Sequence, residues 1–250
     1  MTGKPQNGGF QHYSASPEIL TSHIPSNISS TEAVVLPLAI STASAGLYQP
    51  SYLELPYPTA SPKDSGKVIV VWGGSSSVGS TAIQLCAASG VAVITTASKR
   101  NHEYCKNIGA TEAIDYNSSS VVDDVLSAIK KTGKEFAGIY DSISVPESFK
   151  ANFEILQKAG GSKRMATVLP PPEDKPKDLE VQGVFAVTIG TQHKAVGEAV
   201  WGKFVPTALK DGSLKCLPEP LVIGKGLESV QKGMDKNKEG VSAKKVVIEL

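Results

Sequence analysis

The segment KVIVVWGGSSSVGSTAIQLCAASG, residues 67–90, constrains the fold of this chain more than any other stretch. It begins with an uninterrupted apolar run, residues 68–72, which is mostly β-branched and typical of a strand buried on both faces of a parallel sheet. Gly73 and Gly74 end that run. Apolar residues then recur at helical spacing from Val78 until Gly90 stops the pattern. The segment therefore predicts a strand, a tight turn and a helix in succession.

The glycine-serine turn between that strand and helix has the composition of a phosphate-binding loop. The first N–H groups of a helix have no partner inside the helix, and the helix dipole favours negative charge there. Read as G-x-G-x-x-G, the pattern places Gly74 at the tight turn, Ser76 at the middle position and Gly79 where helix and strand pack closely. Ser75, Ser76 and Ser77 add hydroxyl groups that can bind phosphate oxygens. We therefore predict a dinucleotide pyrophosphate site, with a serine in place of the middle glycine.

The residues after the next predicted strand indicate which dinucleotide binds. A carboxylate about 20 residues after the glycines usually holds the ribose of NAD, whereas cationic side chains there accept the additional phosphate of NADP. At this place the chain has Ser98, Lys99 and Arg100 and no acid. Two cations beside a hydroxyl suit a phosphate dianion, so the sequence predicts NADP(H) rather than NAD(H). The alternative interpretation of Lys99 and Arg100 is a solvated helix start.

Composition argues against several other classes of protein. The 250 residues carry a formal net charge of +1, which gives no electrostatic argument for binding nucleic acid or a membrane surface. The three cysteines form no C-x-x-C pair and the four histidines show no ligand spacing, so we expect neither disulfides nor a metal site. No apolar run is expected to reach the length needed to cross a membrane, and no secretory signal is evident, so we expect a cytoplasmic location.

The alternation of predicted elements indicates an α/β fold with a Rossmann-like, doubly wound parallel sheet and helices on both faces. Strands are expected over residues 68–72, 91–97, 112–116, 136–143, 163–169 and 181–189. Helices are expected over residues 78–90, 101–108, 120–131 and 146–158.

Further elements are expected before and after the sheet. A buried helix over residues 32–49 should be capped by Ser30 or Thr31 and kinked at Pro37. After the sheet we expect a helix over residues 195–209, strands over 217–223 and 245–250, and a helix over 227–234 between those strands.

Several segments resemble the medium-chain dehydrogenase/reductase superfamily, and within it the fungal zinc-independent enoyl reductases that act in trans with polyketide synthases. In chain order they are GGFQHYSAS, LPLAISTASAGLY, VIVVWGGSSSVGSTAIQLC, VITTASKRN, IGATEAIDY, YDSIS and GLESVQKGMDKNKEGVSAKKVVIEL. The resemblance implies pyrophosphate contacts from Ser75, Ser76, Ser77 and Val78, and a 2′-phosphate site at Ser98 and Lys99. It also implies Tyr116 beside the adenosine, Asp141, Ser142 and Ile143 near its ribose, and Thr42 on the nicotinamide or substrate side.

The resemblance also suggests how the chain is divided. In that family a GroES-like substrate domain precedes the matching region, whereas this sequence has only seven residues before Gly8. We therefore expect a remnant of the substrate domain with the buried helix over residues 1–50, a dinucleotide-binding domain over 51–212, and C-terminal strands and a helix over 213–250. Without sheet partners the late strands would expose an edge, which predicts a homodimer.

Two functions remain open from the sequence. The first is an NADPH-dependent, zinc-independent oxidoreductase of the enoyl or quinone reductase type, acting on a polyketide-like intermediate delivered by a synthase, with Thr42 as the catalytic candidate. The second is a fold that has lost hydride transfer and acts as a cofactor-independent cyclase or small-molecule binding protein. The glycine-serine turn and the basic pair favour the first function, and the short N-terminal region favours the second.

Overall fold

The computed structural model describes residues 5–9 and 11–250, so Phe10 of the GGFQHYSAS segment lies outside it. Its centre is a six-stranded sheet in the order β3-β2-β1-β4-β5-β6, and every neighbouring pair in it is parallel. The strands are β1 (Lys67–Trp72), β2 (Ala92–Thr96), β3 (Glu112–Ile114), β4 (Glu135–Asp141), β5 (Arg164–Thr167) and β6 (Glu180–Gly183). The predicted doubly wound sheet is confirmed, and its strand order reverses between β1 and β4.

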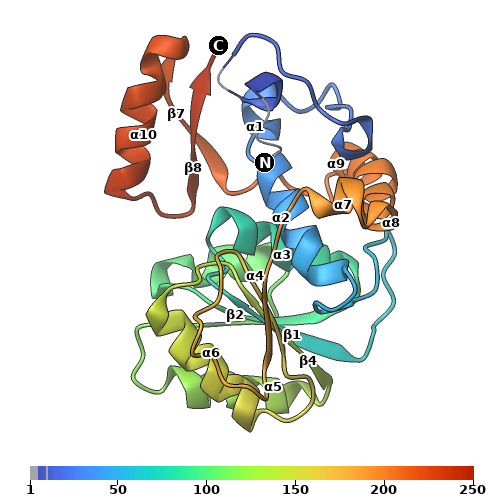
Figure 1. Cartoon of the computed structure of the whole chain (residues 1–250), viewed down its shortest axis with the longest axis vertical. Helices are drawn as coiled ribbons and strands as arrows, with labels where there is room; N and C mark the ends of the chain where they lie inside the picture. The colour runs from blue at the N-terminus through green and yellow to red at the C-terminus, as the bar shows by residue number, and fades with distance from the viewer. Residues whose placement is uncertain (1–4, 10) are drawn as a thin grey trace.

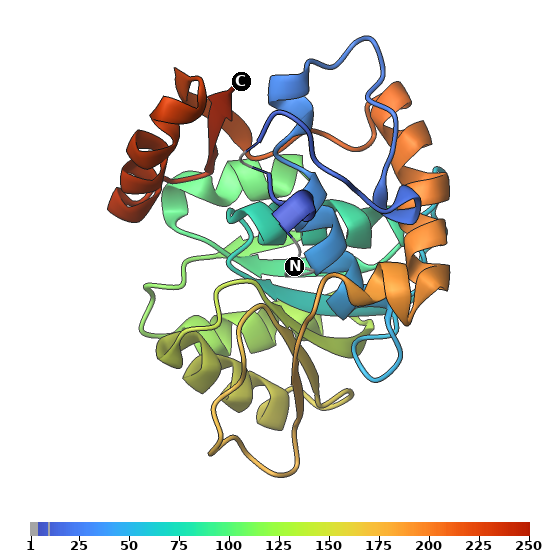
Figure 2. The same ribbon diagram turned by 45° about the horizontal axis from the view of Figure 1, so that its top comes forward.

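Helices cover both faces of this sheet (Figures 1 and 2). One face carries α2 (Pro37–Tyr48) and α3 (Ser77–Ala88), and the other carries α5 (Val121–Thr132) and α6 (Pro146–Lys158). Along β1, Ile69 and Val71 belong to the first core, while Val68 and Val70 belong to the second. This strand therefore reads as a continuous apolar run because both of its faces are buried.

The apolar stretch before the sheet forms two helices instead of one kinked helix. The first, α1 (Ser30–Ala33), begins after Ser29, whose hydroxyl accepts a hydrogen bond from the N–H of Glu32 while the Glu32 carboxylate accepts one from the N–H of Ser29. This capping box places the cap one residue before the predicted Ser30. Helix α2 then starts with Pro37 at its first turn, where a proline needs no N–H partner.

By length and composition the 19 residues Ser30–Tyr48 could cross a membrane, so the expectation that no apolar run reaches that length is wrong. In this structure the run is divided between α1 and α2, and 56% of it is buried. The C-terminal half of α2 packs on α3 and contributes Ala43, Ala45, Leu47 and Tyr48 to the core. A core helix of such composition passes the same test of length and hydropathy.

The chain after β5 departs from the prediction. Strand β6 ends at Gly183, and the predicted strand residues beyond it include the helix α7 (Thr188–Thr191). Strand β6 lies at the edge of the sheet and pairs with β5, which ends at Thr167. Beyond Gly183 the chain therefore has no neighbouring strand with which to extend the pairing. The predicted helix over residues 195–209 is present as α8 (Lys194–Gly197), a π-helical segment η4 (Glu198–Phe204) and α9 (Val205–Asp211).

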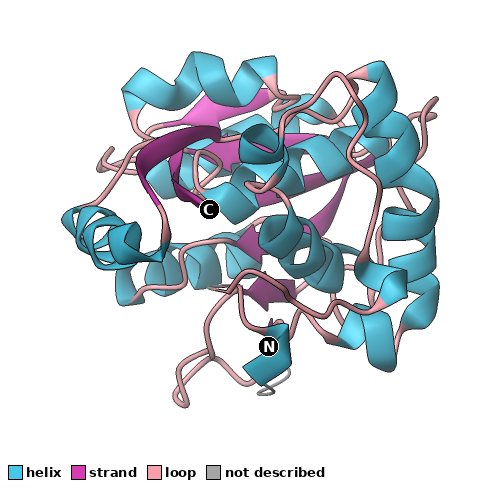
Figure 3. Ribbon diagram, turned by 90° about the horizontal axis from the view of Figure 1, so that it is seen from above, coloured by secondary structure: helices cyan, strands magenta, loops and turns pink. Residues whose placement is uncertain are grey.

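The two C-terminal strands pair with each other, so the expectation that they lack a sheet partner is wrong. Strands β7 (Glu219–Lys225) and β8 (Lys244–Glu249) form a parallel two-stranded sheet, with α10 (Val230–Glu239) between them in the chain and packed on both. Figure 1 shows this C-terminal unit, residues 219–249, in red beside α1, and Figure 3 shows it from above. The homodimer inferred from an unpaired edge stays a prediction.

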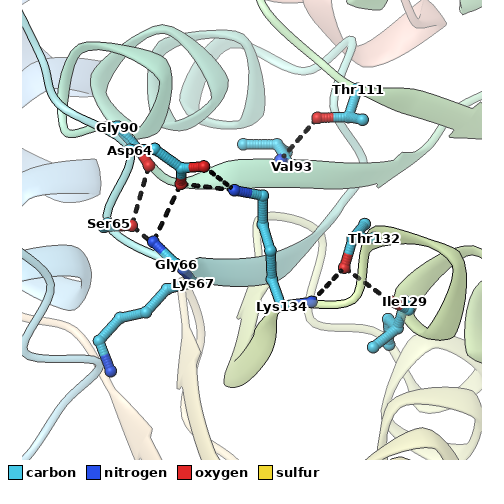
Figure 4. A network of polar contacts seen from close by, with 10 residues as sticks. All are labelled: Asp64, Ser65, Gly66, Lys67, Gly90, Val93, Thr111, Ile129, Thr132 and Lys134. Atoms are coloured by element: carbon cyan, nitrogen blue, oxygen red, sulfur yellow. Dashed lines mark hydrogen bonds and ion pairs between the residues drawn. The ribbon is translucent and has the colours of Figure 1, made fainter.

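Polar contacts join the segments that lead into β1, β2 and β4, at the edge of the sheet where these strands begin (Figure 4). Asp64 accepts a hydrogen bond from the N–H of Gly66 and forms an ion pair with the ammonium group of Lys134, just before β4. Ser65 donates a hydrogen bond to the carbonyl oxygen of Gly90, just before β2. The carboxyl ends of the strands lie at the opposite edge, where open α/β sheets bind their ligands.

Candidate functional site

The glycine-serine turn (residues 73–79) joins β1 to α3 as closely as the sequence predicts. A Cβ atom on Gly79 would lie 2.2 Å from the carbonyl oxygen of Gly73, and one on Gly74 would lie 2.1 Å from Oγ1 of Thr95 in β2. Real Cβ atoms do not approach other atoms that closely, so both positions need glycine. Strand, turn and helix therefore pack with the tightness that a phosphate-binding turn requires.

Ser76, at the middle position of the motif, is the N-cap of α3. Its Oγ accepts a hydrogen bond from the N–H of Gly79 at 3.0 Å and donates one to Oγ of Ser142 at 2.9 Å. Ser142 in turn donates to the carbonyl oxygen of Trp72 at 2.6 Å. The hydroxyl groups of Ser76 and Ser142 are thus engaged within the protein. These hydroxyl groups stabilise the conformation of the turn instead of providing a donor for a bound phosphate.

A cavity of about 660 Å³, the first cavity, opens at the carboxyl ends of β1, β2 and β4. Among the predicted site residues it is lined by Ser75, Ser76, Ser98, Arg100, Tyr116 and Ile143. Tyr116 lies two residues beyond the end of β3 and is 48% exposed, so it belongs to the cavity wall rather than to the predicted strand. The structure thus brings the glycine-serine turn and the predicted 2′-phosphate and adenosine residues to one place. Val78 packs against the core instead.

The basic pair after β2 is divided between two cavities. Arg100 lines the first cavity, whereas Lys99 lines a separate polar cavity together with His102 and Asp115. The pKa of Asp115 is lowered chiefly by the backbone N–H of Asn117 and further by the charge of Lys99. An acid therefore does lie near the predicted 2′-phosphate site. Asp115 follows β3, the strand adjacent to β2 in the sheet, so the residues directly after β2 give no sign of it.

Asp141 lies behind the wall of the first cavity and is fully buried. Its carboxylate accepts hydrogen bonds from the N–H groups of Ile143 at 2.9 Å and Ser144 at 2.8 Å. It also accepts them from Oγ of Ser148 at 2.7 Å and Nδ2 of Asn152 at 3.1 Å. Burial raises the pKa of Asp141, although the four donors act against that rise. The carboxylate thus shapes the loop after β4, and its contact with a ribose stays a prediction.

A second cavity of about 720 Å³ lies along β8 and α10 and shares Ser75 and Ser76 with the first. Lys245 of β8 extends into this region, with Nζ 3.4 Å from Oγ of Ser77, the first residue of α3. Burial lowers the pKa of Lys245. Its neighbour Lys244 pairs with Glu219, but no described carboxylate forms an ion pair with Lys245. A partly buried cation and the N-terminal end of a helix meet here, which suits an anion.

Asn101 and the loop of residues 241–243 belong to the site but were not predicted from the sequence. That loop lines the first cavity, and Asn101 lies between it and the glycine-serine turn. Nδ2 of Asn101 is 3.2 Å from Oγ of Ser75, 3.2 Å from Oγ of Ser98 and 3.1 Å from Oγ of Ser242. Because Ser242 is 141 residues away in the chain, no local pattern could have indicated this contact.

Thr42, the catalytic candidate, lines neither of these two cavities. It lies on α2, where its hydroxyl donates to the carbonyl oxygen of Leu38 at 2.7 Å and its own carbonyl oxygen accepts from the hydroxyl of Tyr140 at 2.8 Å. The hydroxyl of Tyr48, on the same helix, bonds with Ser89 inside the core. A catalytic role for Thr42 stays a prediction.

Comparison with known proteins shows the family. Residues 77–200 match the family described as zinc-binding dehydrogenase. The chain is 39% identical over 263 residues to the dehydrogenase orsE of Emericella nidulans, covering 100% of this chain and 74% of that protein. It is 40% identical over 250 residues to the trans-enoyl reductase himH of Aspergillus japonicus, covering 100% of this chain and 71% of that protein. The chain belongs to the medium-chain dehydrogenase/reductase superfamily.

Solved structures of this superfamily share the fold. The structure of the CurK enoyl reductase superposes with a TM-score of 0.67 at 16% sequence identity, covering 90% of this chain and 64% of that one. The identities to orsE and himH confirm the predicted family, with dehydrogenases and enoyl reductases as relatives, and this superposition shows the shared fold. Despite the description of the matching family, the described part of the chain contains no group of three or more His, Cys, Asp or Glu side chains that could hold a metal ion.

Proposed function

We propose that this protein is an NADPH-dependent, zinc-independent oxidoreductase of the enoyl or quinone reductase type that acts on a polyketide-like intermediate. The observation that carries the proposal is the glycine-serine turn, which lines two cavities, each with a cationic side chain in its wall. Arg100 lines the first cavity, and Lys245 lines the second and lies beside Ser77. Two cations in the cavities that meet at a helix N-terminus favour a ligand that carries phosphate at more than one position.

The residues present fit such a dinucleotide. Ser75, Ser77 and Lys245 would hold its pyrophosphate, because they surround the N-terminus of α3. Ser98 and Arg100 would hold the 2′-phosphate, and Tyr116 would lie beside the adenine. Gly74 and Gly79 let the turn and α3 pack closely against β2 and the end of β1. When bound, NADPH supplies the hydride, and this chain supplies binding, orientation and exclusion of water.

The substrate class is proposed from the relatives. One of them is named a trans-enoyl reductase, which supports an enoyl substrate delivered by a synthase. Zinc independence is proposed because the histidines and cysteines of the sequence show no ligand spacing. A homodimer and a cytoplasmic location remain part of the proposal, but the pairing of β7 with β8 removes the unpaired strands from which the homodimer was inferred.

A cofactor titration, followed by a turnover assay, would test this function. We expect the fluorescence of NADPH to change on binding to the purified chain, and NADPH to be oxidised when a short α,β-unsaturated thioester is added. Ser76→Glu should abolish both signals, since it places a carboxylate against the pyrophosphate. Product formed without NADPH, and by the Ser76→Glu variant, would reject hydride transfer in favour of the cofactor-independent cyclase or binding protein.

A further inference from the structure

We propose that Asn101 is a positioning residue that holds the C-terminal unit against the glycine-serine turn and so completes the dinucleotide cleft. The inference rests on the proposed function, because it concerns the same cleft. Asn101 is 9% exposed, and its side-chain amide reaches hydroxyl groups from three separate parts of the chain.

The three hydroxyl groups belong to the three walls of the first cavity. Ser75 lies in the glycine-serine turn, Ser98 follows β2, and Ser242 lies between α10 and β8. Their Oγ atoms are 3.1–3.2 Å from Nδ2 of Asn101. An amide nitrogen has two protons, so the three acceptors share them. A single side chain therefore ties the turn to the C-terminal unit.

Few other contacts hold the C-terminal unit on the rest of the chain: β7 packs on α1, Val247 joins the first core, and the hydroxyl of Thr31 donates to the carboxylate of Glu249 at 3.2 Å. Its strands and helix bury only Gly233 and Val247. An isolated two-stranded sheet is at best marginally stable in water, and α10 buries only Gly233. The unit must therefore depend on contacts with the rest of the chain. The polar contacts at the cleft are Asn101 with Ser242 and Lys245 with Ser77.

The loop that Asn101 holds is itself in an unfavourable conformation. Ala243 has φ +48, a left-handed conformation that an alanine rarely adopts. Surrounding contacts must maintain such a backbone. Because this loop lines both cavities, a dinucleotide in the cleft would touch the turn and the C-terminal unit together. Ligand binding is then coupled to the docking of the C-terminal unit on the turn. A ligand that binds the docked form stabilises it, and a substitution that loosens the unit weakens ligand binding.

Hydrogen exchange of the full chain without cofactor tests the role of Asn101. We expect Asn101→Ala to speed exchange in residues 230–249 by about fivefold to tenfold, the loss expected for one or two hydrogen bonds. Exchange in β1 and α3 should stay unchanged. Asn107→Ala is the matched control, since Asn107 is the exposed last residue of α4 (His102–Asn107), the helix that Asn101 precedes as N-cap, and should leave both regions unchanged. Ser242→Ala should loosen the same residues as Asn101→Ala.

The proposal also predicts a change in affinity that follows the change in exchange. The Kd for NADPH should rise several-fold in Asn101→Ala and Ser242→Ala but not in Asn107→Ala, and saturating NADPH should restore most of the protection. Unchanged exchange in residues 230–249, or faster exchange throughout the protein, would overturn the proposal. If the unaltered chain does not bind NADPH, the proposed function fails, while exchange without cofactor still decides the role of Asn101.

Discussion

The hydroxyl of Ser76 lies 2.9 Å from that of Ser142 and joins the glycine-serine turn to the loop after β4. These two loops follow β1 and β4, the strands between which the order of the sheet reverses. Ser76 also caps α3 through the N–H of Gly79. The serine that replaces the middle glycine of the motif therefore stabilises the turn with bonds that a glycine could not make.

Substitutions at Ser76 should show how much its hydroxyl stabilises the protein. We expect Ser76→Ala to lower the free energy of unfolding by about 1–2 kcal/mol, because it removes an N-cap and a buried hydrogen bond. Ser76→Gly should cost less as a cap, since glycine at an N-cap is only a few tenths of a kcal/mol worse. Urea unfolding measures both. Equal stability of Ser76→Ala and the unaltered protein would contradict the role given to this hydroxyl.

Arg100 should contribute more than Lys99 to the preference for NADPH over NADH. Arg100 lines the first cavity, while Lys99 faces the neighbouring cavity that contains Asp115. A charge-assisted bond contributes about 1.5–3 kcal/mol, so Arg100→Ala should reduce the preference by roughly 10- to 150-fold. Lys99→Ala should reduce it by a smaller factor. Titration of each variant with both cofactors decides, and a larger effect of Lys99→Ala would refute the assignment.

Gly79→Ala should disrupt the turn. The new Cβ would lie 2.2 Å from a backbone oxygen that cannot move away as a side chain can, so we expect a loss of about 1–3 kcal/mol in stability together with weaker NADPH binding. Gly202→Ala is the matched control. No atom lies within 4 Å of the position of its added Cβ, and an exposed helical glycine replaced by alanine should gain about 0.5–1 kcal/mol. Thermal unfolding of both variants provides the comparison.

The sequence predicted what depends on local pattern. The glycine-serine turn could be located because strand, turn and helix are adjacent in the chain, and α6 was found with its exact ends because Pro146 starts it. The pairing of β7 with β8 and the approach of Lys245 to Ser77 depend on residues far apart in the chain, and no local signal marks them. The sequence could not show whether the Ser76 hydroxyl caps α3 or binds phosphate, because serine is a typical residue for both roles.

Thr42 provides a test of the substrate side. It lies on α2, away from the glycine-serine turn, so Thr42→Ala should leave the Kd for NADPH unchanged. If its hydroxyl serves the substrate, turnover should fall on the order of tenfold, the effect of one hydrogen bond. Thr42→Ser keeps the hydroxyl and should restore turnover. Full activity of Thr42→Ala would remove Thr42 from the list of catalytic candidates.

Lys245 should destabilise the protein without cofactor and stabilise it with cofactor. Burial lowers the pKa of Lys245 below its ordinary 10.5, so the folded chain binds this proton less tightly than the unfolded chain does. Stability rises with pH wherever the unfolded state binds more protons. At neutral pH we therefore expect Lys245→Met, which has no charge, to be more stable than the unaltered protein. That advantage should shrink as the pH rises through the lowered pKa towards 10.5.

Addition of NADPH should reverse the ranking at neutral pH, because Lys245 then gains a phosphate partner beside Ser77. Lys244→Met is the control, since Lys244 pairs with Glu219 and should change the response to NADPH little. Urea unfolding at neutral and alkaline pH, with and without NADPH, measures all of these differences. If Lys245→Met were the less stable protein without cofactor, or if its difference from the unaltered protein did not vary with pH, Lys245 would not be the unpaired cation inferred here.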